Sequence, residues 1–406
     1  MKRIEGGVTA AKGFLAGGIH AGIRAGRTKR DLGLIFSEAP CAAAGLFTRN
    51  QVKADPVLLD METLKDPHAR AIIANSGIAN ACAPNGMVHA REMQAIAAEA
   101  LGIPNEEVLV GSTGVIGMEL FTEAIANGIS ELKASLSDGP EGSDACAEAI
   151  MTTDTVKKEF AVEFELDGTP VRIGGISKGS GMIHPNMGTM LAYLTTDCAI
   201  DCGLLKKALK QVCDKTFNRI SVDGDTSTND SLIILANGRA ENDVISEEGS
   251  AFDAFKEALE AVCTLLARTM AKDGEGAKHL ITCTVRHAES EAKAERLAKA
   301  VIGSSLTKAA IFGCDANWGR VLCALGYSGE TFDPETVDIR FESNAGVIDV
   351  CRDGKGLPFD EALAKKILSE EEVIIDADMK EGDSEVTCWG CDLTYDYVKI
   401  NGDYRT

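Results

Sequence analysis

The sequence predicts a mixed α/β fold (α/β, in part α+β) with layers of sheet and helix around a core and a smaller C-terminal α/β lobe. Short apolar runs typical of strands alternate with stretches of helical periodicity along most of the chain. Hydrophobic residues make up 45% of the 406 and charged residues 25%, as in globular proteins. A chain of this length can form two or three lobes.

The individual elements follow from the spacing of apolar residues between turn residues. Strands are expected at residues 32–38, 69–77, 106–114, 190–197, 231–238, 281–288, 337–341, 345–350 and 392–400. Helices are expected at residues 90–102, 204–217, 252–271 and 292–303. A hairpin is expected over 158–176, because two alternating runs meet at Asp167-Gly168. The pattern restarts near residue 280, which predicts a larger lobe over 1–280 and a smaller one over 281–406.

The net charge of the chain limits which kinds of molecule it is expected to bind. Lysine and arginine number 41 and aspartate and glutamate 62, so the formal charge is −21. A chain this acidic repels nucleic acid and anionic membranes, so we expect neither as a partner and favour small cationic or zwitterionic molecules. The apolar stretch near the N-terminus is short and broken by glycines, unlike a signal peptide or a membrane span. We therefore expect a cytoplasmic protein.

The 13 cysteines are spread singly through apolar runs, which favours reduced, buried thiols over disulfides. One close pair, Cys388 and Cys391 in CWGC, is compatible with a redox pair or with half of a zinc site. No second CxxC and no HxxxH accompanies it in the sequence, so we favour a packed strand and predict no metal site.

The most informative segment is KGSGMIHPNMGTMLAYLTTD, from Lys178 to Asp197, in which a loop with glycine and proline changes into an apolar run at Gly188–Thr189. A threonine in this place can attack the carbonyl of the preceding glycine, and the α-amine released by the cleavage can then act as a base for the same hydroxyl. The alternative is an ordinary β-branched strand residue, and the local sequence leaves both open.

The segment GSTGVIG follows an expected strand and combines the hydroxyl of Thr113 with the flexible amide of Gly114. Two donors aimed at one point form an oxyanion hole for acyl transfer, although an ordinary glycine-rich turn has the same composition. Neither this loop nor KGSGMIH matches a dinucleotide-binding GxGxxG, since His184 stands where the third glycine belongs. A nicotinamide enzyme is therefore disfavoured.

Two charged residues are candidates for substrate binding, with solvated surface charges as the alternative. Lys178 lies in a stretch rich in glycine, where we expect a loop, and its ammonium suits a carboxylate. Glu275, in DGEGA, is flanked by glycines that allow close approach to a ligand, and its carboxylate suits an ammonium group. The polar segments NSGIANAC, DGDTSTND and FGCDANWGR are typical of site-lining loops and of plain turns alike.

Together these segments resemble the glutamate N-acetyltransferase family, also called the ornithine acetyltransferase or ArgJ family. The resemblance covers essentially the whole chain, because ten segments occur in the family's order. They are GGVTAAKGF, FTRNQVKADPV, NSGIANAC, GSTGVIG, MTTDT, KGSGMIHPNMGTML, DGDTSTND, DGEGA, CDANWGR and CDLTYDYVKINGDYRT. This chain departs from the common pattern at Gly188 and His184, where alanine is usual, and at Ile78, where asparagine is usual.

The resemblance implies self-cleavage between Gly188 and Thr189 into an α chain of residues 1–188 and a β chain of residues 189–406, associated as an α2β2 heterotetramer. It implies that Thr189 accepts the acyl group and that Thr113 and Gly114 hold the oxyanion. The implied substrate contacts are Thr152, Lys178, Thr189, Glu275, Asn401 and Thr406. Thr153 remains an alternative to Thr152, and the C-terminal residues are open to completing their own site or a neighbour's.

The activity implied by the resemblance is a ping-pong transfer of an acetyl group from N2-acetylornithine to glutamate through acetyl-Thr189, in arginine biosynthesis. No resident cofactor is expected, and acetyl-CoA is left open as a second donor that would make the enzyme bifunctional. The alternative is a self-processing amidohydrolase or aminopeptidase that delivers the acyl group to water. Which end of the substrate Lys178 and Glu275 each hold also stays open.

Overall fold

Strands of the larger lobe form two of the three sheets in the computed structural model, which describes residues 1–24, 26, 28–184 and 190–402. The first sheet has the strand order β1-β7-β8-β9-β11-β4. Its strands are β1 (Lys2–Ile4), β7 (Lys158–Leu166), β8 (Thr169–Lys178), β9 (Leu191–Thr196), β11 (Ser231–Ala236) and β4 (Ala42–Phe47). Strands β9 and β11 are parallel, so both begin at the same edge of the sheet.

The second sheet has the order β2-β3-β5-β6 and is accompanied by the first helices of the chain. Its strands are β2 (Phe14–Ile19), β3 (Leu32–Ser37), β5 (Ala71–Asn75) and β6 (Val108–Ser112). The helices of this part are α1 (Asp55–Thr63), α2 (Gly86–Leu101), α3 (Thr122–Ala134) and α4 (Pro140–Ala149), with the short 3-10 helices η1 (Gly7–Thr9) and η2 (Asn105–Glu107).

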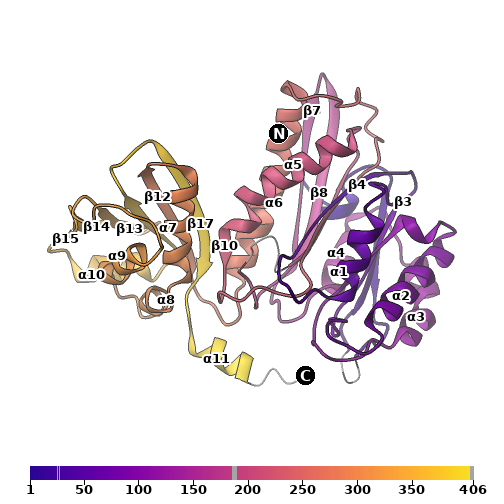
Figure 1. Ribbon diagram of the computed structural model, residues 1–406, viewed down its shortest axis with the longest axis horizontal. Helices are drawn as coiled ribbons and strands as arrows, with labels where there is room; N and C mark the ends of the chain where they lie inside the picture. The colour runs from indigo at the N-terminus through magenta and orange to yellow at the C-terminus, as the bar shows by residue number, and fades with distance from the viewer. Residues whose placement is uncertain (25, 27, 185–189, 403–406) are drawn as a thin grey trace.

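The two sheets of the larger lobe lie face to face, and helices cover their outer faces (Figure 1). The helices α5 (Cys202–Lys215) and α6 (Ser250–Lys272) pack on the first sheet, and α1, α2 and α3 pack on the second. Strand β9 illustrates the layering, because its side chains alternate between two cores. Ala192 and Leu194 face the α5/α6 layer, whereas Leu191 and Tyr193 face the second sheet.

The smaller lobe is built on a sheet of order β10-β17-β12-β16-β13-β14-β15 with its own hydrophobic core. The strands are β10 (Ile220–Ser221), β17 (Ser384–Cys391), β12 (Leu280–Ala288), β16 (Glu372–Asp378), β13 (Asp338–Ser343), β14 (Gly346–Arg352) and β15 (Lys355–Gly356). Its helices are α7 (Glu291–Gly303), α8 (Ser305–Phe312), α9 (Trp318–Gly326) and α10 (Glu361–Leu368). Strand β10 follows the 3-10 helix η3 (Phe217–Arg219) and pairs with β17, so the sheet joins the two lobes.

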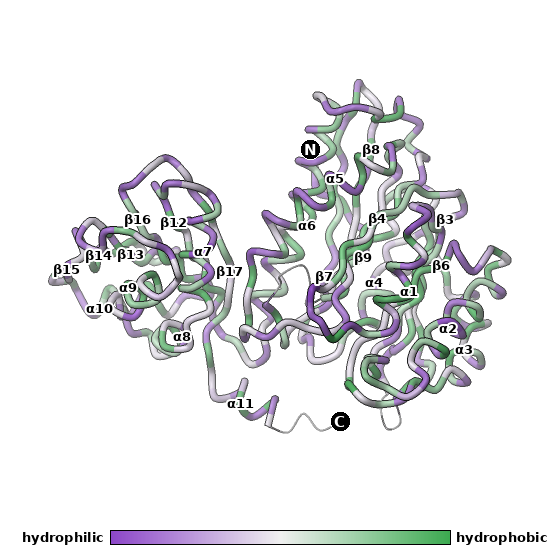
Figure 2. The backbone as a smooth tube through the Cα atoms, in the orientation of Figure 1, coloured by the Kyte–Doolittle hydropathy of each residue, from purple (hydrophilic) through white to green (hydrophobic). Residues whose placement is uncertain are grey.

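The predicted α/β class is confirmed, and most predicted elements are present. The expected hairpin is β7 and β8, whose turn residues Asp167 and Gly168 have φ of 48° and 83°, the positive values that a tight two-residue turn requires. Figure 2 shows the hydrophobic positions following interior strands such as β4 and β9, while polar positions are frequent on the turns and outer helices. Cys388 and Cys391 lie buried in β17, which confirms the packed strand.

The strand expected at residues 392–400 is wrong. Strand β17 ends at Cys391, and Tyr395–Gly402 form helix α11, which lies below the two lobes in Figure 1. Thr394 caps this helix, because its hydroxyl accepts a hydrogen bond from the backbone N–H of Tyr397 at 3.3 Å. The alternation of apolar residues in DLTYDYVKI therefore gave a wrong prediction, and Thr394, directly before Tyr395, was the better signal of a helix start.

No helix among the described residues combines the length and the apolarity that crossing a bilayer requires.

Candidate active site

A cavity of about 130 Å³ opens at the edge of the first sheet, where β8 ends and β9 and β11 begin. Residues that the sequence singled out in five separate segments lie together around it. They are Thr113, Gly114, Thr152, Thr153, Lys178, Glu275 and Asn401. Gly188, Thr189 and Thr406 lie outside the described residues, but Met190, which follows Thr189 in the chain, lines the cavity.

The loop after β6 brings Thr113 and Gly114 to the cavity. The backbone N–H of Thr113 donates to the carbonyl of Asn75 at 3.0 Å, which continues the β5–β6 pairing past the end of the strand. Gly114 has φ of 131°, and a Cβ there would lie 2.3 Å from the carbonyl carbon of Gly77. Only glycine fits this close approach, so the loop geometry depends on Gly114.

Two polar segments whose role the sequence left open hold this loop in place. In NSGIANAC, the amide of Asn75 donates to the carbonyl of Ile78 at 2.9 Å, and its oxygen accepts from Ser112 at 2.7 Å. In DGDTSTND, the buried amide of Asn229 donates to the carbonyls of Ala79 at 2.6 Å and Ser112 at 2.9 Å. These segments therefore fix the position of the Thr113–Gly114 loop against the start of β11.

Lys178 is the last residue of β8 and pairs with Leu191 of β9, so the loop expected around it is wrong. The antiparallel pairing of β8 and β9 overrides the local glycine content. Its ammonium group is buried and donates to the Thr113 hydroxyl at 3.4 Å. Burial lowers the pKa of Lys178, and the nearby carboxylate of Asp154 opposes that change. The cation therefore lies beside the pair predicted to hold an oxyanion.

A buried ion cluster that the sequence did not reveal lies below the cavity. Lys158 bridges Asp154 at 2.7 Å and Asp273 at 2.6 Å. Asp154 also accepts hydrogen bonds from the backbone N–H groups of Thr152 at 3.1 Å and Gly179 at 2.7 Å. Burial alone would raise the pKa of Asp154, but the ammonium groups of Lys158 and Lys178 lower it to about 2. The carboxylate therefore stays ionised and holds two segments of the cavity wall.

Glu275 also lines the cavity. Its backbone N–H donates to the carbonyl of Ser180 at 2.8 Å, and its carboxylate accepts from the Asn401 amide at 2.7 Å. A Cβ at Gly181 would lie 2.3 Å from a carboxylate oxygen of Glu275, so Gly181 is needed for this approach. Asn401 of helix α11 therefore reaches Glu275 of its own chain and lines the cavity.

Asp223 connects helix α11 to the segment that leads toward the candidate cleavage site. Its carboxylate accepts from the backbone N–H groups of Met182 at 2.6 Å and Ile183 at 2.8 Å, and from the Tyr397 hydroxyl at 3.2 Å. Burial raises the pKa of Tyr397, and the Asp223 carboxylate raises it further. The tyrosine therefore stays neutral and donates a hydrogen bond to Asp223.

The cavity thus has a cation, an anion and a pair of candidate oxyanion donors among its lining residues. Lys178 and Glu275 suit a small molecule that carries both a carboxylate and an ammonium group. The Thr113 hydroxyl and the Gly114 loop suit a tetrahedral oxyanion near Lys178. Such an arrangement can bind an amino-acid derivative and stabilise acyl transfer at one end of it.

The comparisons with known proteins all point to one family. The family model described as ArgJ family matches residues 15–406. The chain is 51% identical over 408 residues to the arginine biosynthesis bifunctional protein ArgJ of Symbiobacterium thermophilum, and 51% identical over 407 residues to the protein of that name from Caldanaerobacter subterraneus. In both cases the match covers 100% of each chain. A crystal structure of ArgJ from Bacillus halodurans is 44% identical with a TM-score of 0.49, covering 52% of this chain and 97% of that chain.

Proposed function

The chain belongs to the ArgJ family, and we propose that it moves an acetyl group from N2-acetylornithine to glutamate in arginine biosynthesis. The observation that carries this function is the full-length match to curated ArgJ proteins, taken together with a cavity that suits a zwitterionic amino-acid derivative. The word bifunctional in the names of those relatives supports a second activity, acetylation of glutamate from acetyl-CoA. Acetyl-CoA would then be a co-substrate, and no resident cofactor is required.

Thr189 is the nucleophile of the proposed reaction, after cleavage between Gly188 and Thr189. The free α-amine of residue 189 would have an ordinary pKa of about 8, so a useful fraction is neutral near pH 7 and can take the hydroxyl proton. The hydroxyl oxygen attacks the acetyl carbonyl, and the oxyanion accepts hydrogen bonds from Thr113 and Gly114. Loss of ornithine leaves acetyl-Thr189, which then transfers the acetyl group to the amine of glutamate.

The position of Lys178 beside Thr113 favours one orientation of the substrate. In N2-acetylornithine the α-carboxylate and the acetylated nitrogen are bonded to the same carbon, so a carboxylate near the oxyanion site falls to Lys178. The distal ammonium then extends toward Glu275 and Asn401. The Thr153 hydroxyl is engaged with Ser180 at 2.7 Å, which favours Thr152 as the substrate contact on that wall. Thr406 is proposed as a further contact.

The proposed mature enzyme is an α2β2 heterotetramer of the two cleavage products in the cytoplasm. The resemblance of the sequence to its family supports this assembly. The α and β chains stay interleaved in this fold, since β7 and β8 before the cleavage site share a sheet with β9 and β11 after it.

The experiment that tests this function uses Thr189→Ala. This variant should remain a single chain of 42.9 kDa on a denaturing gel and should transfer no acetyl group to glutamate. Thr195→Ala, at the far end of β9, is the matched control and should still cleave and transfer. Cleavage and transfer by the Thr189 variant would reject the proposed nucleophile.

A second experiment distinguishes acetyl transfer from hydrolysis. Wild-type protein is incubated with N2-acetylornithine, with and without glutamate, and ornithine and acetate are measured. A transferase releases ornithine much faster with glutamate present and makes acetylglutamate. An amidohydrolase would release ornithine and acetate at the same rate in both reactions.

A further inference from the structure

Met182 lines the cavity, and the proposed transfer mechanism gives it no role. The other large apolar residues of the lining, Met190 and Leu191, are buried and belong to hydrophobic cores. Met182 is 41% exposed, and within the described part of the chain it belongs to none of the cores. Its thioether side chain is therefore available to a molecule bound in the cavity.

The backbone of Met182 adopts a conformation that favours glycine. Its φ is 57°, in the left-handed region, where a side chain with a Cβ is strained. Glycine occupies this region without strain, and the same short segment already contains Gly179 and Gly181. A methionine in a strained conformation on the wall of a cavity indicates that its side chain has a use there.

Hydrogen bonds on both sides hold the backbone of Met182 in this conformation. The two carboxylate oxygens of Asp223 accept from the N–H of Met182 at 2.6 Å and from the N–H of Ile183 at 2.8 Å. On the other side, the carbonyl of Ser180 accepts from the N–H of Glu275 at 2.8 Å. A strained residue persists where its surroundings fix it in this way. These bonds use backbone groups of the segment, so they do not depend on the thioether.

Met182 lies next to the part of the cavity wall that Glu275 forms. A Cβ at Gly181 would lie 2.3 Å from a carboxylate oxygen of Glu275, and adjacent Cα atoms such as those of Gly181 and Met182 are about 3.8 Å apart. In the proposed orientation of N2-acetylornithine, the α-carboxylate is at Lys178 and the distal ammonium is at Glu275. The methylene chain between these two charges therefore needs an apolar neighbour close to Glu275, and Met182 is in that place.

We propose that Met182 is a specificity residue that contacts the methylene chain of an N-acetylated diamino acid, an inference that rests on the proposed function. Lys178 and Glu275 bind the two charges of the substrate, and Met182 selects the length of the chain between them. A chain of matching length brings both charges to their partners and covers the thioether, which removes apolar surface from water. An unbranched, polarizable side chain is well adapted to such a contact.

The test compares acetyl donors that differ by one methylene. Transfer to glutamate is measured for wild type and Met182→Gly with N2-acetylornithine, with its longer lysine analogue and with its shorter diaminobutyrate analogue. The wild type should prefer N2-acetylornithine. Met182→Gly should lower kcat/KM for N2-acetylornithine by about tenfold, mainly through a higher KM, and should reduce its advantage over the lysine analogue by a similar factor.

The choice of glycine separates a binding role from a structural one. Glycine accepts the left-handed backbone without strain, so the denaturation midpoint of Met182→Gly should stay close to that of the wild type while the kinetic constants change. Met182→Leu restores apolar volume at the same position and should recover most of the wild-type kcat/KM. A loss for Met182→Leu as large as that for Met182→Gly would contradict an apolar contact.

Glu241→Gly is the matched control. Glu241 has φ of 62°, is exposed and does not line the cavity, so the same replacement removes the same kind of backbone strain elsewhere. This variant should keep the wild-type kcat/KM for all the donors. A change as large as that for Met182→Gly would mean that backbone flexibility, and not the lost thioether, alters the kinetics.

The outcomes separate this inference from the function on which it rests. If the wild type transfers acetyl groups and Met182→Gly keeps both its kcat/KM and its preference among the donors, the role of Met182 is overturned and the proposed function stands. Equal kcat/KM values of the wild type for all the donors also overturn a selection by length. If the wild type transfers an acetyl group from none of the donors, the proposed function fails, and this inference fails with it.

Discussion

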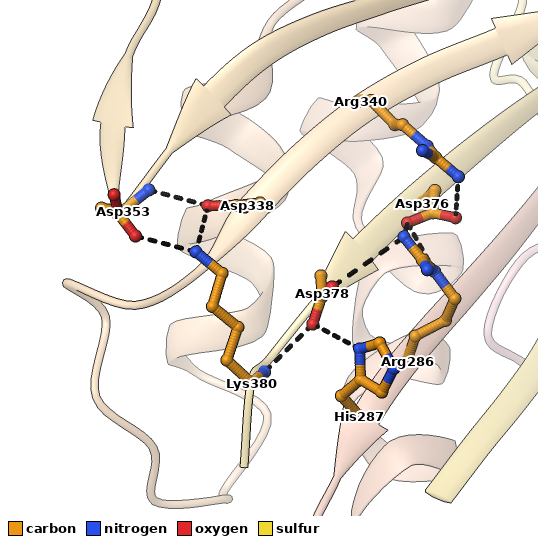
Figure 3. Close-up of polar contacts among 8 residues, drawn as sticks. All are labelled: Arg286, His287, Asp338, Arg340, Asp353, Asp376, Asp378 and Lys380. Carbon is orange, nitrogen blue, oxygen red and sulfur yellow. Dashed lines mark hydrogen bonds and ion pairs between the residues drawn. The ribbon is translucent and has the colours of Figure 1, made fainter. Parts of the chain in front are cut away.

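Two lysines, one in each lobe, make the same contacts in different surroundings. Lys158 lies below the cavity of the larger lobe and bridges Asp154 at 2.7 Å and Asp273 at 2.6 Å, with its side chain 0% exposed. Lys380 lies on the smaller lobe and bridges Asp338 and Asp353, both at 2.8 Å, with its side chain 37% exposed (Figure 3). The ion pairs of Lys158 and Lys380 therefore agree in charge and nearly in distance, and they differ in how deeply the lysine is buried.

The difference shows that burial, more than contact geometry, decides what an ion pair does. Water screens the charges of Lys380 and of its partners Asp338 and Asp353. The network in Figure 3 extends from there through Arg286, Asp376 and Arg340. Around Lys158 no water competes, so Asp154 stays ionised and holds the backbone N–H groups of the cavity wall. The network of Lys380 lies on the surface of the smaller lobe, whereas the cluster of Lys158 holds the wall of the cavity in place.

The largest expected effect is the loss of one buried partner. Lys158→Met leaves two carboxylates buried without their cation and should lower the free energy of unfolding by about 3–5 kcal/mol. Lys380→Met, the matched change on the surface, should lower it far less, because water screens the exposed pairs. Both values come from guanidinium or urea denaturation at neutral pH. Equal losses for the two variants would contradict the role given to burial.

The second expected effect is a difference in acid stability. The pKa of Asp154 falls from 3.8 to about 2 in the folded protein. Its ionised form therefore stabilises the fold fully above the unfolded value, and this contribution of about 2 kcal/mol is lost as the pH falls through about 2. Denaturation at several values between about pH 5 and pH 2 should show this loss in the wild type, and Asp154→Asn should remove it.

Asp353 provides the control for that experiment. Lys380 lowers the pKa of the Asp353 carboxyl through a hydrogen bond, but the group lies in water. Asp353→Asn should leave the acid profile close to that of the wild type, because the solvent screens the interaction. A profile that changes as much as for Asp154→Asn would mean that the two networks are equivalent.

The third expected effect concerns the cavity wall. Gly181→Ala places a Cβ against the carboxylate of Glu275 and should displace it, raising the KM for N2-acetylornithine roughly tenfold with a smaller change in kcat. Gly326→Ala in helix α9 is the control, since nothing lies within 4 Å of a Cβ there. Steady-state kinetics of both variants provide the measurement. An unchanged KM for Gly181→Ala would argue against Glu275 as a substrate contact.

The smallest expected effect is the response to salt. The stability difference between wild type and Lys380→Met should shrink toward zero at about 1 M sodium chloride, where charges are screened over about 3 Å. The difference caused by Lys158→Met should persist, because the buried cluster is not reached by mobile ions. A salt response of the same size in both variants would contradict the contrast between the two lobes.

The candidate site was partly predictable from the sequence. Thr113, Gly114, Lys178 and Glu275 stood in glycine-rich segments that are unusual for plain surface, and the structure places all of them around one cavity. Asp154 and Lys158 are spaced by four residues, but they are bridged along a bend and a strand, so helical spacing gave no signal. Asp273, the third residue of this buried ion cluster, is over 100 residues from Lys158 along the chain.

The sequence by itself determined the local elements and the residue types available for chemistry. Periodicity is a property of neighbouring residues, so strands such as β9 and the turn at Asp167-Gly168 followed from it. Helix α11 was missed because its start depends on the Thr394 cap and on its docking at Gly276. The tertiary structure alone decided which carboxylates are buried, which have partners, and which segments meet at the edge of the first sheet. Burial and contact depend on residues far apart in the chain, and those depend on how the layers pack.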